Sequence, residues 1–197
     1  MSLTSICCFK SCFEGTGFSL KPVPVRIGER ICLDESHKGS DVLLIKNATR
    51  TCGAGGVLCS APLVQNKSYF EVKLQQSGIW GVGVATKNAD LSLAPGGNDS
   101  ESWVYCSDGS IKHNSTPVHQ NLIAAQEGDT IGVTYDHIEL NFYINGKCLE
   151  KPVSGIRGTV YPALYVDDGA VLDFIPQDFI APQPSGFEAI MLEKSLL

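Results

Sequence analysis

The clearest pattern of hydrophobic and polar positions lies in residues 128–147, GDTIGVTYDHIELNFYINGK. Apolar side chains alternate there with small or polar ones in two runs: Ile131, Val133 and Tyr135, then Leu140, Phe142 and Ile144. A period of two is typical of strands with one buried face. Asp136-His137 can form the turn between the runs, and Asn145-Gly146 tolerates the positive φ angles of a type I′ hairpin. The segment therefore predicts antiparallel hairpins.

Short strand-like runs recur between turn signals along the rest of the chain. They are residues 30–33, 42–46, 57–59, 69–75, 79–86, 103–106, 110–113, 160–166 and 170–174. Many short strands without a convincing internal helix indicate an all-β sandwich.

One of these runs, IWGVGVA at residues 79–85, has two unequal faces. Trp80, Val82 and Val84 share one face, whereas the other carries mainly glycine and alanine. Glycine weakens a strand unless a neighbour approaches its backbone closely. We expect the bare face to lie under another layer or a bulky side chain; an edge strand with a bulge is the alternative.

The length of 197 residues suits one domain, and composition divides it into three parts. Residues 1–24 form a cysteine-containing leader, and residues 25–176 hold the strands. Residues 177–197 form a tail interrupted by Pro182 and Pro184. A shared helical face, formed by Phe187, Ile190 and Met191, predicts a short C-terminal helix or coil packed on the sandwich.

Charge and cysteine usage exclude several classes of protein. With 15 Lys+Arg against 21 Asp+Glu, the formal charge of −6 disfavours nucleic acid as a partner. The apolar runs fall far short of the roughly 20 residues that a membrane-spanning helix needs. The eight cysteines follow a start, MSLTSICCFK, that lacks the features of a signal peptide. We expect a reduced, cytoplasmic protein.

Several motifs in order resemble the SPRY domain, the core of the B30.2 family. They are YFEVKL at 69–74, WGVGVAT at 80–86, SWVYCSDGSIKHN at 102–114, the 128–147 hairpin and VYPALYV at 160–166. The resemblance covers roughly residues 25–176. It implies a bent two-sheet antiparallel sandwich of concanavalin-like topology that binds peptides or proteins through loops at one end. It further implies a non-enzymatic adaptor without a cofactor, which we expect to be a monomer.

The best candidate site is the turn that follows the Tyr-Pro strand, where SPRY domains commonly present a loop that contacts the ligand. Peptide-binding relatives of the suppressor-of-cytokine-signalling-box type often carry Trp-Gly there, whereas this chain has Asp167, Asp168 and Gly169. The departure implies an anionic site that selects Lys, Arg or a free amine. The alternative is an ordinary Asp-Gly turn in solvent, with Asp chosen for local backbone hydrogen bonds.

Two further polar loops can face the same end. Residues 34–41 contribute His37 and Lys38, and residues 93–101 contribute Asp99 and Glu101. If the three loops converge, their carboxylates repel one another unless a cationic partner or an ion relieves them.

No pattern in the sequence indicates catalysis or a metal site. The chain lacks a local signature of a nucleophile with its base, and the glycines at 53–56 lie between strands rather than at the start of a helix. The histidines are scattered, and Cys7-Cys8 lacks the spacing usual for zinc. An alternative function is a lectin-like domain with an acidic, calcium-dependent loop site for carbohydrate.

Cys7 and Cys8 also resemble an S-acylation site, which would associate the protein with a membrane through its leader. The alternative is a leader whose phenylalanines pack on the sandwich.

Overall fold

The structure, a computed structural model, describes residues 30–192, which form fifteen strands and no helix. The strands are β1 (Leu33–Lys38), β2 (Asp41–Ile45), β3 (Arg50–Cys59), β4 (Ser68–Gln76), β5 (Ile79–Ala85), β6 (Ser102–Cys106), β7 (Ile111–His113), β8 (Thr116–His119), β9 (Thr130–Tyr135), β10 (Glu139–Ile144), β11 (Lys147–Cys148), β12 (Val153–Ser154), β13 (Tyr161–Asp167), β14 (Val171–Ile175) and β15 (Glu188–Ala189). Residues 30–192 contain no helix that is long and apolar enough to span a bilayer.

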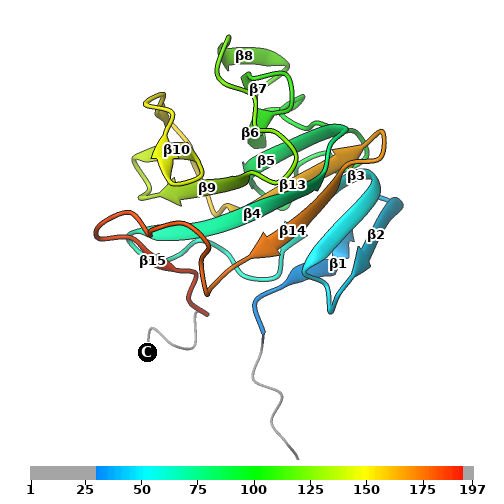
Figure 1. The fold of residues 1–197 in the computed structure, drawn as a ribbon, viewed down its shortest axis with the longest axis horizontal. Helices are drawn as coiled ribbons and strands as arrows, with labels where there is room; N and C mark the ends of the chain where they lie inside the picture. The colour runs from blue at the N-terminus through cyan, green and yellow to red at the C-terminus, as the bar shows by residue number, and fades with distance from the viewer. Residues whose placement is uncertain (1–29, 193–197) are drawn as a thin grey trace, which may run out of the picture.

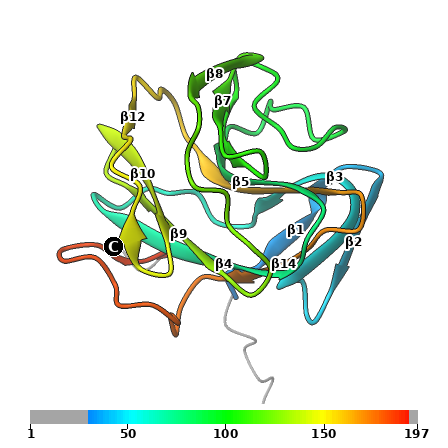
Figure 2. The same cartoon turned by 45° about the horizontal axis from the view of Figure 1, so that its top comes forward.

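The strands follow one continuous path that bends into two layers (Figure 1). The path runs β11-β10-β9-β4-β14-β3-β13-β5-β6-β7-β8. Strand β3 belongs to both layers: residues 50–54 pair with β2 in the first sheet, and residues 55–58 pair with β13 in the second. All pairings are antiparallel except that of β15 with β4. The predicted all-β, bent antiparallel sandwich is confirmed, and Figure 2 shows the same strands with the top of the molecule tilted forward.

The main hydrophobic core fills the space between the sheets. Trp80, Val82 and Val84, on the bulky face of β5, all belong to it. Aromatic rings connect the layers, with centroids 5.4 Å apart for Trp80 and Tyr105, and 5.6 Å apart for Tyr105 and Phe142 of the opposite sheet. Offset and edge-on aromatic contacts of this kind add to the stabilisation from buried area.

The bare face of β5 is covered, as its pattern predicts. The loop between β5 and β6 crosses it so closely that a Cβ on Gly81 would lie 1.8 Å from the carbonyl oxygen of Pro95. Tyr165, on the neighbouring β13, is fully buried under the same loop and packs in a second cluster with Leu58 and Val104. Only glycine permits this approach, because any side chain at position 81 would meet backbone atoms.

The 128–147 segment forms the predicted hairpin. Strands β9 and β10 pair in register from Tyr135↔Leu140 to Ile144↔Ile131. Asn145 and Gly146 both have positive φ, 50° and 80°, which are the angles of a type I′ turn.

Two expectations about the strands are wrong, and a third strand was not predicted. Residues 34–41, expected as a loop, mostly form β1, an irregular strand that pairs with β3. Strand β1 was not recognised in the sequence because most of its side chains are polar, and they are polar because one side of the strand is exposed. Strand β3 begins at Arg50 rather than at Val57, since Gly53 and Gly55, both with positive φ, bend the strand between the sheets without ending it. Strand β8 also forms despite Pro117, because it lies at a sheet edge.

The C-terminal segment, as far as it is described, packs back on the sandwich as coil with a two-residue strand. Glu188 and Ala189 pair with Ser68 and Tyr69 of β4, and Ile190 joins the main core. The helical spacing was misleading here, because Pro182 and Pro184 lack amide hydrogens and Gly186 has a φ of 81°.

Candidate functional site

The turn at residues 167–170 is a tight turn that connects β13 of one sheet to β14 of the other. Asp168 and Gly169 have φ angles of 49° and 79°, and the Ala170 amide donates to the Asp167 carbonyl over 3.0 Å. A carboxylate oxygen of Asp167 accepts the Asp168 amide over 2.7 Å. This type I′ geometry accounts for Asp-Gly in the turn, while the side chain of Asp168 stays exposed.

Further carboxylates lie at this end of β5. Asp167 is paired with Ile79, the first residue of β5, whose side chain is 40% exposed. On the other flank of β5, the Ser107 amide donates to the Trp80 carbonyl, which places Asp108 at the same end. Glu127 reaches the β4–β5 loop, where it accepts the Ser77 amide over 3.2 Å. We call Asp108, Glu127, Asp167 and Asp168 with Ile79 the acidic end.

Asp99 and Glu101 lie at the opposite end of β5. Glu101 accepts the hydroxyl of Thr86, the residue that follows β5, over 2.5 Å. Seven residues of strand at about 3.3 Å each separate this end from Asp167 by roughly 23 Å. The acidic loops therefore do not form one site.

The carboxylate of Asp99 organises its own loop. It accepts the amides of Asp90 and Glu101, over 2.6 and 2.9 Å, and the hydroxyl of Ser102 over 2.7 Å. With three internal donors, it has little capacity left for a visiting ligand.

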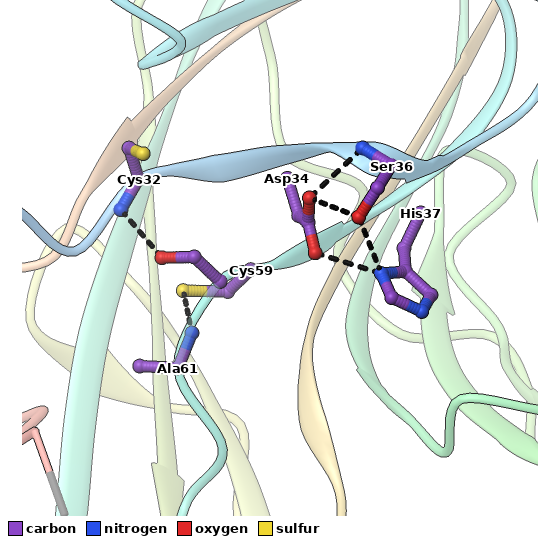
Figure 3. Close-up of polar contacts among 7 residues, drawn as sticks. Cys32, Asp34, Ser36, His37, Cys59 and Ala61 are labelled. Atoms are coloured by element: carbon purple, nitrogen blue, oxygen red, sulfur yellow. Dashed lines mark hydrogen bonds and ion pairs between the residues drawn. The ribbon is translucent and has the colours of Figure 1, made fainter.

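His37 and Lys38 lie in the irregular strand β1, which pairs with β3 and not with β5. Figure 3 shows the polar contacts of His37. His37 Nδ1 is 2.7 Å from Asp34 Oδ2 and 3.0 Å from Ser36 Oγ. Burial raises the pKa of Asp34, but hydrogen bonds from Ser36 and His37 outweigh it and lower the pKa. Lys38 donates to the Val42 carbonyl over 2.8 Å.

This Asp-Ser-His group is not a catalytic triad. A triad requires the acid and the nucleophile on different nitrogens of the imidazole, whereas Asp34 and Ser36 both contact Nδ1. Cys59, also drawn in Figure 3, accepts the Ala61 amide at its sulfur over 3.5 Å. Burial raises the pKa of the Cys59 thiol to about 12, so it is not a nucleophile at neutral pH.

Within residues 30–192, no group of three or more His, Cys, Asp or Glu side chains is placed to hold a metal ion. Cys7 and Cys8 lie outside the described residues.

A fully buried acid, Glu71 of β4, was missed by the sequence analysis. It accepts the Tyr69 hydroxyl over 2.8 Å and the backbone amides of Ile180 and Ala181 over 2.7 and 3.0 Å. It thereby fastens the C-terminal segment across the outer face of the first sheet. The only signal was its position in YFEVKL, on the face opposite Phe70 and Val72.

Comparison with known proteins places the chain among SPRY proteins. Residues 67–178 match the SPRY domain. Over 201 residues, the chain is 47% identical to SPRY domain-containing protein 7 of Homo sapiens and of Mus musculus, and 100% of each chain is covered. The same protein of Gallus gallus is 46% identical over 200 residues, again with full coverage of both chains.

Solved structures agree with this fold. The PSpry domain of TRIM65 has a TM-score of 0.60 at 16% identity, covering 75% of this chain and 90% of that one. The SPRY domain of human HERC1 also has a TM-score of 0.60, at 18% identity, covering 75% and 99%. At such low identity these likenesses support the fold alone.

Proposed function

Because this chain belongs to the SPRY domain family, whose members are generally non-enzymatic protein-interaction modules, we propose that it is an adaptor that binds a basic protein or peptide at its acidic end. The adaptor acts as a monomer and performs no chemistry on its partner. Rigid strands hold the loops of this end in place, which lowers the entropy lost on binding.

The observation that carries the proposal is that the exposed Ile79 lies at the same end of β5 as four carboxylates. An apolar centre within a charged rim is a common composition for a recognition surface. Of the four acids, Asp108 alone has a basic partner among the described residues, Lys112 at 2.6 Å. The carboxylates of Asp167 and Asp168 remain available for charge-assisted hydrogen bonds with Lys or Arg.

The test compares wild type with a D167N/D168N variant. Asparagine keeps the shape and tolerates the positive φ of position 168, so the turn is retained while two charges are lost. Partners captured by proximity labelling in cells are purified, and their affinities are measured by surface plasmon resonance. We expect the variant to bind at least about tenfold more weakly, with a faster dissociation rate.

Asp178 supplies the matched control. It is exposed and has a φ of 55°, as Asp168 does, but it lies in the C-terminal segment. A D178N variant should bind as wild type does. Equal affinity of wild type and D167N/D168N for every direct partner would refute the proposal.

The lectin alternative has no observation in its favour. A calcium site needs six to eight oxygen ligands, and the acidic loops that were to supply them lie at opposite ends of β5. We therefore do not propose it.

We also propose a cytoplasmic location, with membrane association if Cys7 and Cys8 are acylated. Five cysteines of the described range are free thiols, which suits a reducing compartment. Intact mass of the protein from eukaryotic cells, before and after hydroxylamine, tests the acylation. A single unmodified mass would refute it.

A further inference from the structure

A small pocket lies at the end of β5 opposite the acidic end. Its volume is about 330 Å³, and it is lined by Thr86, Lys87, Asn88, Glu101, Arg157, Gly158, Thr159 and Tyr161. The loop after β5 supplies one wall, and the segment that leads into β13 supplies the other. The two walls are held together because Tyr161 pairs with Ala85 in the sheet.

Two cations converge on this pocket in a chain whose net charge is −6. Lys87 and Arg157 are exposed, and neither has an ion-pair partner within the described range. The Lys87 ammonium lies 5.3 Å from the centroid of the Tyr161 ring. This cation–π contact directs the lysine over the pocket wall rather than freely into solvent.

Glu101 is the one acid in the lining, and it does not cancel the two cations. One of its oxygens accepts the Thr86 hydroxyl, and the lining keeps a net positive formal charge. The amide of Asn88 and the hydroxyls of Thr159 and Tyr161 add uncharged donors. Such a set suits an oxyanion, because Arg binds carboxylate or phosphate with two parallel hydrogen bonds while Lys adds a point charge.

We propose that this pocket is a second recognition site, which takes a single acidic side chain, a carboxylate or a phosphate, from a bound protein. The volume fits one side chain, and a concave site of this size favours a peptide over a flat membrane surface. The site lies a full strand length from the acidic end and has the opposite charge. Two sites of this kind let one domain hold two partners at the same time.

The test is a titration of the full chain, labelled with ¹⁵N, by two-dimensional NMR. The probes are three peptides, acetyl-Ala-Ala-X-Ala-Ala-amide, in which X is phosphoserine, glutamate or serine. We expect the first two peptides, and not the serine peptide, to shift the amides of residues 86–88 and 157–159. The phosphoserine and glutamate arms distinguish the two sources of the oxyanion by their relative affinity.

A K87Q/R157Q variant should bind the acidic peptides about tenfold or more weakly. K151Q is the matched control, since it removes an exposed lysine outside the pocket, and it should bind as wild type does. Because both pocket cations are exposed, the variants keep the wild-type spectrum outside the site. An unchanged affinity of K87Q/R157Q, equal shifts with the serine peptide, or binding only to phosphatidylserine vesicles would overturn the proposal.

Discussion

The contacts of Glu71 allow a quantitative prediction for the substitution Glu71→Gln. The carboxylate is fully buried and accepts three hydrogen bonds, two of them from backbone amides of the C-terminal segment. Glutamine keeps one acceptor oxygen, and its NH₂ group then faces a donor. At about 1.5–3 kcal/mol for each hydrogen bond to a charged group, the loss of one or two would cost roughly 1.5–6 kcal/mol.

The removal of a buried charge offsets part of this cost, because a carboxylate pays a larger desolvation penalty than an amide. We therefore expect E71Q to lower the free energy of unfolding by about 2 kcal/mol, near the low end of that range. Urea unfolding measures it. Hydrogen exchange localises the effect, and the amides of Ile180 and Ala181 should exchange at least about tenfold faster, since 1.4 kcal/mol corresponds to a factor of ten.

The control is Glu139→Gln, at an exposed position of β10, which should change stability by less than about 0.5 kcal/mol. A double-mutant cycle with Tyr69→Phe should show coupling, because the Tyr69 hydroxyl contacts the same carboxylate. If E71Q unfolds at the wild-type urea concentration and its amides exchange at wild-type rates, the reasoning is wrong.

Three further predictions concern acid stability, packing and thiol reactivity. Burial raises the pKa of Asp173, but Arg50 and Lys46 outweigh it and lower the pKa. The ionised Asp173 therefore stabilises the folded protein above about pH 4, and this stabilisation is lost as pH falls through the folded pKa. D173N should flatten this acid limb of stability in urea titrations, and an unchanged limb would contradict the assignment. Gly81→Ala should prevent folding or cost several kcal/mol by thermal unfolding, because its Cβ would meet the Pro95 carbonyl; wild-type melting would disprove that contact. Burial raises the pKa of Cys59 to about 12, so its thiol should react with a thiol reagent at neutral pH only when the protein unfolds. Fast labelling of Cys59 in the native protein would contradict its burial.

The hairpins and the covered strand were predictable because their signals are local. Asn145-Gly146 requires only its own backbone angles. The glycine face of β5 likewise implies a close neighbour, although not that the loop with Pro95 supplies it. Strand β1 was missed since its polar, irregular course depends on pairing with β3, which lies about twenty residues further along the chain.

The candidate site was less predictable, because distance between loops depends on register. Asp167 pairs with Ile79 at the start of β5, whereas Glu101 contacts Thr86 after its end. Nothing in the sequence says which end of a strand a distant loop will reach. For the same reason, the sequence did not reveal that Lys87 and Arg157, which are seventy positions apart, line one pocket.

Strand β3, which both sheets share, determines when this chain can fold during its synthesis. Its residues pair with Ala163 at one end and with Asp173 at the other, more than a hundred positions later. Until the ribosome has released those partners, the centre of neither layer can form, and the edges of β3 and β4 stay open to other chains. A nascent chain of this protein therefore keeps these strand edges unpaired until nearly its whole length has emerged.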